Sequence, residues 1–92
     1  MIKKTKDAYK QIAEIIQKAL DYNKNLEEGY TPIKLTTLEI SRGLYNTIIK
    51  NGIVMCVYHV CQELGIENCN KAPFEIVLYD NDDYCQLYIN YK

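Results

Sequence analysis

Four cysteines and a single histidine are the side chains of this chain with the greatest chemical reactivity. Together they are Cys56, His59, Cys61, Cys69 and Cys85. Thiolates and imidazoles are the ligands that zinc prefers, and structural zinc sites commonly hold two of them in a C-x-x-C pair. The sequence contains no such pair, and Cys85 falls on the core-facing side of a predicted β-hairpin. We therefore interpret the cysteines as small buried apolar residues, with no bound metal and no cofactor.

A cysteine nucleophile would need more than the sequence supplies. Cys56 and Cys61 flank His59 within one predicted helix. A catalytic thiol needs solvent access, a lowered pKa and a base that a third group orients. The neighbouring residues are mostly apolar, and the chain has neither a phosphate-binding glycine-rich loop nor a hydrolase motif. These observations favour a protein that is not an enzyme.

Residues 80–83, Asp-Asn-Asp-Asp, resemble a fragment of a calcium-binding loop. They lack the central glycine and the distal glutamate that complete such a loop. We therefore interpret them as a solvated turn between two segments, 74–79 and 84–91, which together contain four tyrosines. Both segments alternate in polarity with a period of two, which predicts an antiparallel β-hairpin with an acidic tip.

The pairing of this hairpin can be predicted from its residues. Placing Asn81 and Asp82 at the centre of the connection sets Leu78 opposite Cys85, with one face entirely apolar. A four-residue loop over 80–83 is preferred to a two-residue turn, because the shorter turn would set Asp80 against Asp83. The predicted core face consists of Phe74, Ile76, Leu78, Cys85, Leu87 and Ile89. The opposite face carries Val77, Tyr79, Tyr84 and Tyr88.

Helical periodicity predicts a first helix over residues 5–28. Apolar side chains recur at helical spacing from Ala8 to Leu26. Thr5 suits the N-cap, and Gly29 suits the position just past the end of the helix.

A second helix is predicted over residues 36–50. Thr36 and Glu39 have the types and spacing of a capping box, which marks a helix start. Gly43 would cost this helix about 1 kcal/mol relative to alanine, so we expect close packing at that position.

A third helix is predicted over residues 53–64, with Gly65 ending it in a Schellman motif. It is apolar nearly all round, which predicts the central buried helix. Asn51-Gly52 is interpreted as the cap of the second helix. A hairpin that joins 44–50 to 53–60 is the alternative.

Length and charge limit the class of protein. The chain has 92 residues and a net charge of −1. Residues 1–34 carry seven lysines and five acids, whereas residues 72–92 carry four acids and one lysine. A dedicated nucleic-acid-binding protein usually has a basic surface, so the charge argues against that class. The N-terminus lacks the apolar stretch of a secretory signal, and the apolar run 53–60 is too short to span a bilayer.

These patterns together predict an α+β fold. We expect three helices, 5–28, 36–50 and 53–64, packed on a small antiparallel sheet that ends in the hairpin 74–79 and 84–91. An additional edge strand over residues 30–35 would tolerate Pro32. We expect residues 1–92 to form a single compact domain, located in the cytoplasm.

The outer face of the hairpin is the best functional candidate. Tyrosine is enriched at protein interfaces. We therefore predict a small non-enzymatic protein-binding module that contacts another protein, one with a basic surface, through a defined set of residues. Homodimerisation and coverage by another part of the chain are the other options. The predicted binding residues are Val77, Tyr79, Tyr84, Tyr88, Asp80, Asp82 and Asp83.

Composition extends this prediction. Lysine outnumbers arginine ten to one, and isoleucine, asparagine and tyrosine are abundant, which is typical of AT-rich coding. A phage or mobile-element accessory protein that inhibits a host defence complex fits this pattern.

The alternative is a small DNA-binding transcriptional regulator, in which the basic N-terminal helix contacts the phosphates of the DNA backbone. Residues 35–64 would then form a helix-turn-helix, but its recognition helix has no lysine or arginine for base contacts. The phosphate contacts would be Lys3, Lys4, Lys6, Lys10 and Lys18.

Overall fold

The computed structural model describes residues 1–3 and 5–92, and the predicted α+β fold is confirmed within them. The described chain forms three α-helices, a short 3-10 helix and a three-stranded antiparallel sheet. The side chain of Thr5, a predicted N-cap, lies outside the described part. In chain order the elements are α1 (Thr5–Lys24), β1 (Leu35–Ile40), α2 (Arg42–Asn51), α3 (Ile53–Leu64), η1 (Cys69–Lys71), β2 (Phe74–Asp80) and β3 (Cys85–Tyr91).

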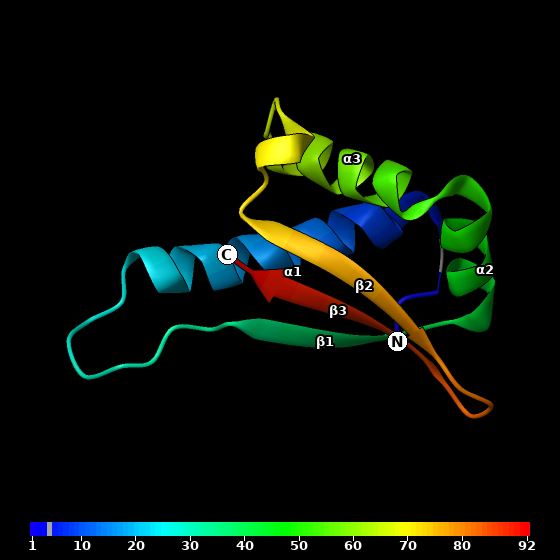
Figure 1. The fold of residues 1–92 in the computed structure, drawn as a ribbon, viewed down its shortest axis with the longest axis horizontal. Coiled ribbons are helices and arrows are strands. Elements are labelled where there is room, and N and C mark those ends of the chain that lie inside the picture. The colour runs from blue at the N-terminus through cyan, green and yellow to red at the C-terminus, as the bar shows by residue number, and fades with distance from the viewer. Residues whose placement is uncertain (4) are drawn as a thin grey trace.

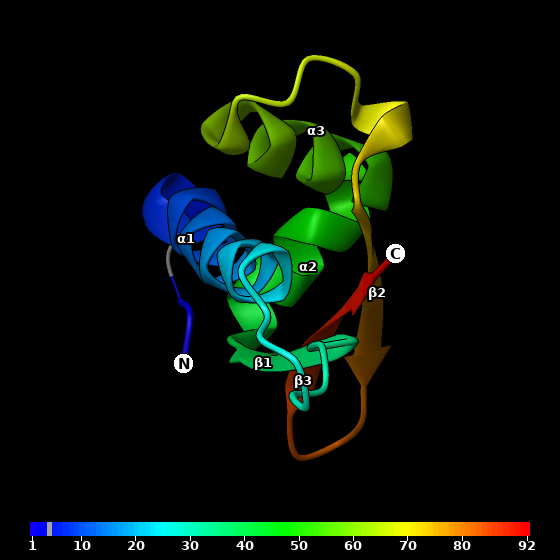
Figure 2. The ribbon, with the colours of Figure 1, turned by 90° about the vertical axis from the view of Figure 1, so that its left-hand side faces the viewer.

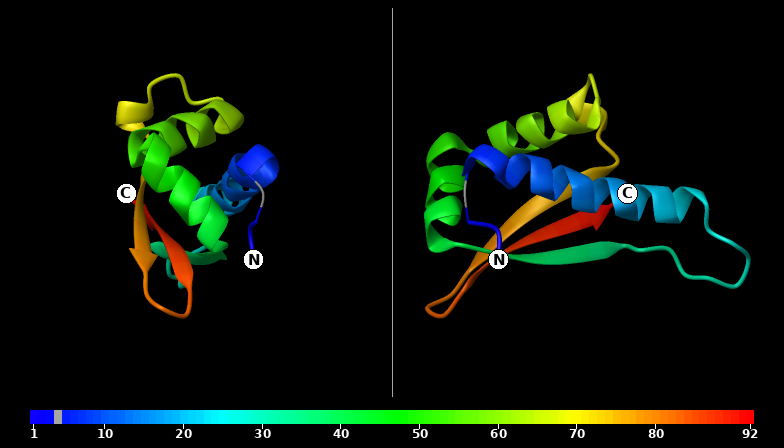
Figure 3. Two further views of the ribbon diagram at one scale, coloured as in Figure 1. Left: turned by 90° about the vertical axis from the view of Figure 1, so that its right-hand side faces the viewer. Right: turned by 180° about the vertical axis from the view of Figure 1, so that it is seen from behind.

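The sheet has the strand order β1-β3-β2, so the last strand of the chain is the central one. Both neighbours run antiparallel to it (Figure 1). The three α-helices lie on one side of the sheet, as Figure 2 shows, and α1 runs beside α3. Figure 3 shows from two further sides that no described helix crosses the opposite face.

The hydrophobic core fills the space between the sheet and the helices. Phe74, Leu87 and Ile89 supply the sheet side, and Ile12 and Val60 come from α1 and α3. All five side chains are buried. Complete burial of such a side chain stabilises a fold by about 1.5–3 kcal/mol, so the core is the main source of stability here.

The start of the predicted second helix is wrong, because residues 35–40 form strand β1. Their side chains alternate between the two faces of the sheet, with Ile40 buried and Glu39 exposed. The helix begins six residues later than predicted, at Arg42, where the Ser41 hydroxyl accepts a hydrogen bond from the Leu44 amide (3.1 Å). The third strand is therefore 35–40 and not 30–35. The spacing of Thr36 and Glu39 fits a capping box, but pairing with β3 prevails over that local signal.

Gly43 does not mark close packing. A Cβ atom at this position would meet only the Ser41 Oγ, at 3.9 Å. The glycine lies in the exposed first turn of α2, so the expected contact with another element is wrong.

Helix α1 ends at Lys24, four residues before its predicted end. The Asn23 side chain donates a hydrogen bond to the Ile33 carbonyl (2.9 Å) and accepts one from the Ile33 amide (2.7 Å). These two bonds hold the following loop against the helix. Gly29 therefore lies in a turn of that loop and does not cap the helix.

Helix α3 has the predicted bounds and the predicted Schellman ending. Gly65 adopts the left-handed conformation (φ 75°), and the Ile66 amide donates to the Cys61 carbonyl (2.9 Å). Gly52 ends α2 as predicted, so the alternative hairpin over 44–60 does not form. The expectation of burial all round is wrong, because Val54 is 71% exposed on the side facing away from the core.

The two faces of the hairpin are as predicted, but the pairing is shifted by two residues. Leu78 faces Leu87 and not Cys85, and Asp80 is the residue opposite Cys85. The loop therefore spans 81–84, which excludes both predicted connections. The Asn81 side chain causes this shift, since its Oδ1 accepts hydrogen bonds from the amides of Asp83 (2.8 Å) and Tyr84 (2.9 Å). A shift by two residues preserves the faces because side chains alternate with a period of two.

No described helix combines the length and the apolar character that a bilayer crossing requires.

Candidate functional site

The outer face of the sheet is built from alternate residues of all three strands. Thr37, Tyr88 and Val77 form one row across β1, β3 and β2. Glu39, Gln86 and Tyr79 form the next row towards the hairpin tip. Since the helices lie on the other side, no described segment of the chain covers these side chains (Figure 2).

Four residues of the outer face, Val77, Tyr79, Tyr84 and Tyr88, form an aromatic cluster that we name the tyrosine face. The Tyr79 ring centroid lies 6.1 Å from that of Tyr84 and 6.1 Å from that of Tyr88. Val77, Tyr79 and Tyr84 are 46%, 43% and 37% exposed. The predicted pairing of Leu78 with Cys85 would set Tyr79 opposite Tyr84, and this is wrong, because Tyr79 faces Gln86 and Tyr84 lies in the loop. The rings are nevertheless neighbours.

One hydroxyl group of the tyrosine face forms a hydrogen bond within the sheet. The Tyr88 hydroxyl donates to the Gln86 side chain (2.8 Å), which fixes the ring at the centre of the sheet. A tyrosine ring offers a large apolar area with a polar end, so such a surface can bury area and still form hydrogen bonds.

The acids of the hairpin tip have two different roles. Asp80 forms an ion pair with Arg42, and the Arg42 guanidinium also donates to the Asn81 carbonyl (2.7 Å). Asp80 therefore attaches the tip to the start of α2. Asp82 and Asp83 are exposed, and the described residues place no ion-pair partner beside them. Their negative charge is available to a partner.

Sequence reasoning missed two parts of this surface. Thr37 and Glu39 were assigned to a helix, so their place on the outer face could not be predicted. Arg42 is the only arginine of the chain, which is the one signal that could have drawn attention to it.

The cysteines and the histidine lie apart from this surface. Cys56, Cys61 and Cys85 are buried, and burial raises the pKa of the Cys56 thiol to about 12. Such a thiol stays protonated near neutral pH and is a poor nucleophile. The His59 ring stacks on Tyr9 with centroids 5.0 Å apart, between α3 and α1. Within residues 1–3 and 5–92, no group of three potential metal ligands comes together.

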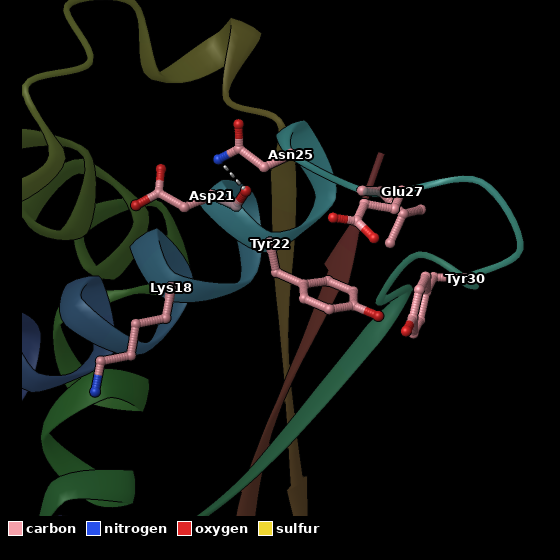
Figure 4. Close-up of a pocket in the computed structure, with 7 residues that line it drawn as sticks. Lys18, Asp21, Tyr22, Asn25, Glu27 and Tyr30 are labelled. Atoms are coloured by element: carbon pink, nitrogen blue, oxygen red, sulfur yellow. Dashed lines mark hydrogen bonds between the residues drawn. The ribbon is translucent and has the colours of Figure 1, made fainter.

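A hollow in the surface lies at the end of α1, as Figure 4 shows. It has a volume of about 540 Å³ and lies between the helix and the following loop. The Asn25 side chain donates to the Asp21 carbonyl there (3.0 Å). The charged side chains that line it, Lys18, Asp21 and Glu27, are exposed, so they do not form a desolvated charged pair of the kind that catalysis uses. The lining residues are Lys18, Asp21, Tyr22, Asn25, Leu26, Glu27 and Tyr30.

The lysines of the alternative DNA-binding prediction are only partly described. Lys3, Lys10 and Lys18 are exposed, whereas Lys4 and the side chain of Lys6 lie outside the described part. The predicted entry of a helix-turn-helix is strand β1.

Comparisons of the chain with family models, with curated proteins and with solved structures found no match.

Proposed function

We propose that this protein is a non-enzymatic protein-binding module that contacts its partner through the tyrosine face. One observation carries the proposal: the helices cover the opposite side of the sheet, so the aromatic cluster has no cover within the described chain. Tyrosine buries a large area at a small cost in side-chain entropy and is enriched among the residues that dominate binding energies. An exposed aromatic cluster on a rigid sheet is therefore suited to binding.

The partner surface that fits best is basic. Asp82 and Asp83 lie at the tip, and Glu39 and Glu75 lie on the outer face beside the tyrosines. Complementary charge speeds association and suppresses wrong partners. Asp80 has a different role in this proposal, since its ion pair with Arg42 holds the tip in place.

A narrower proposal rests on composition. The AT-rich coding signature supports a phage or mobile-element accessory protein, and the partner would then be a host defence complex. The acidic tyrosine face would occupy a basic nucleic-acid channel of that complex.

A pull-down with matched variants tests the proposal. The bait is the protein itself in a lysate of its native host, beside the triple variant Tyr79→Ala, Tyr84→Ala, Tyr88→Ala. The control triple variant changes three other exposed tyrosines, Tyr22, Tyr30 and Tyr58.

We expect the native protein and the control to capture the same partner, and the first triple variant to lose it while keeping its circular dichroism spectrum. Capture that survives in the first triple variant would refute the proposal. A salt-sensitive shift of duplex DNA by the protein alone would favour the DNA-binding alternative.

A further inference from the structure

The two edges of the sheet differ in how they are protected. At the β1 edge, the Ile2 amide donates to the Glu39 carbonyl (3.3 Å) and the Ser41 amide donates to the Ile2 carbonyl (2.9 Å). The N-terminal residues therefore cover one end of that edge in a parallel bridge.

The β2 edge has no strand partner along its seven residues within the described chain. The Lys92 amide donates to the Pro73 carbonyl across the β2–β3 pair (3.0 Å). The backbone groups of Pro73, and hence of the odd-numbered residues that follow it, therefore point towards β3. Because backbone groups point alternately to the two sides of a strand, the even-numbered residues from Phe74 to Asp80 direct theirs away from β3. No other described segment pairs with them. The strand has two charged residues, Glu75 and Asp80, and Pro73 precedes it, but within the strand there is no lysine, proline or bulge to protect the edge.

The two ends of β2 carry opposite charge. Lys71 and Lys92 are exposed at its start, and Asp82 and Asp83 are exposed beyond its end. Figure 1 shows this separation, with the hairpin turn extending past α2 and the C-terminus near the other end of the strand. If β2 of a second copy of the chain paired antiparallel with this strand, the two lysines of each copy would lie beside the two aspartates of the other. This contact would occur once at each end of the paired strands.

We propose that β2 pairs antiparallel with β2 of a second copy, forming a two-fold homodimer with a continuous six-stranded sheet. Since the even-numbered residues direct their backbone groups outward, they must form the hydrogen-bonded pairs. A two-fold axis at the middle of the strand pairs Ile76 with Leu78 of the second copy. Val77 then faces Val77 of the second copy, and Glu75 faces a tyrosine instead of another acid.

An apolar groove beside β2 supports this arrangement. It has a volume of about 220 Å³ and lies between α3 and the first half of the strand, next to the exposed Val54. Leu78 of the second copy reaches this groove, because it lies opposite Ile76 on the same face. The apolar lining comes from Ile53, Val54, Val57, Phe74 and Ile76.

The homodimer goes beyond the proposed function, because its strands pair at the edge of the sheet. Only Val77 and Tyr79 of the tyrosine face border the joined edge, and Tyr84 and Tyr88 lie away from it. Both tyrosine faces stay on one side of the joined sheet and remain open to a partner. Oligomeric state therefore tests the homodimer without reference to partner capture.

Sedimentation equilibrium with two opposite charge variants tests the proposal. The native protein should have twice the mass of its 10.7 kDa chain. Val77→Lys and Val77→Glu each place like charges across the two-fold axis, so each alone should raise the dimer Kd by at least about tenfold. An equimolar mixture should restore the dimer, because lysine then faces glutamate. Thr37→Lys, on the same face beside the other edge, is the control and should stay dimeric.

Several results would overturn the proposal. A native protein that stays monomeric at its highest soluble concentration has no such interface. A dimer that survives in Val77→Lys uses another surface. Failure of the mixture to restore the dimer would contradict the pairing centred on Val77.

The charged ends give a second, independent readout. The double variant Lys71→Glu, Lys92→Glu should weaken the dimer several-fold, and added salt should weaken the native dimer. A dimer that neither change affects would contradict the proposed charge pairing.

Discussion

Leu87 and Tyr88 are neighbours on the central strand, and they belong to opposite faces of one sheet. Leu87 is buried beneath the helices, whereas Tyr88 lies on the side that no described helix covers. The same alternation separates Ile76 from Val77 on β2. The comparison shows how a sheet with helices on one side assigns stability to one set of alternate residues and leaves the other set available for binding. Changes on the two faces should therefore have separable effects.

The largest expected effect is on the inner face. Leu87→Ala removes a fully buried side chain and leaves a cavity, so it should lower the free energy of unfolding by about 2–5 kcal/mol. Tyr88→Ala removes a half-buried ring, its contact with Tyr79 and its hydrogen bond to Gln86, and should cost less, about 1–2 kcal/mol. Urea denaturation of the two variants measures both values. Equal losses would show that the outer face also holds the fold together.

A second difference concerns pH. Burial raises the pKa of the Cys56 thiol from 9.0 to about 12. Between these values the unfolded chain has lost the proton that the folded chain keeps, so stability should fall as the pH rises from about 9. The slope from this group is at most about 1.4 kcal/mol per pH unit.

Cys56→Ala should flatten this slope in denaturation curves measured at several pH values. Val60→Ala, which shortens a buried side chain of the same helix and changes no titratable group, is the matched control and should leave the slope unchanged. Burial also raises the pKa of Cys61, Cys85 and Tyr9, so part of the slope should remain. A slope that Cys56→Ala does not reduce at all would assign the effect to those other groups.

The smallest expected effect is at the hairpin tip, where the two faces meet. Arg42→Ala removes the ion pair to Asp80 and the bond to the Asn81 carbonyl. Both ionic side chains are exposed, so global stability should change little. Amide hydrogen exchange at Asp83 and Tyr84 should become faster, because the Asn81 turn loses its attachment to α2. Unchanged exchange at these amides would show that Arg42 does not hold the tip.

Some of this architecture could be predicted from the sequence, because it depends on local periodicity. The period of two assigned the hairpin residues to their faces, and the Gly65 ending located α3. The hairpin pairing could not be predicted, since it depends on two hydrogen bonds that the Asn81 side chain accepts. The helix prediction over residues 36–40 is wrong for a related reason. Thr36 and Glu39 suit a helix start as well as a strand, and only the pairing with β3 decides between them.

The central claim is that the outer face of the sheet is the binding surface, and oxidative footprinting of the tyrosines tests it most directly. The chain has nine tyrosines, and each reports the exposure of its own side chain. Hydroxyl-radical labelling is compared by mass spectrometry between the free protein and the captured complex. We expect protection of Tyr79, Tyr84 and Tyr88 in the complex, with Tyr22 and Tyr58 labelled as in the free protein. Protection of Tyr22 or Tyr58, with the three outer tyrosines still labelled, would contradict it.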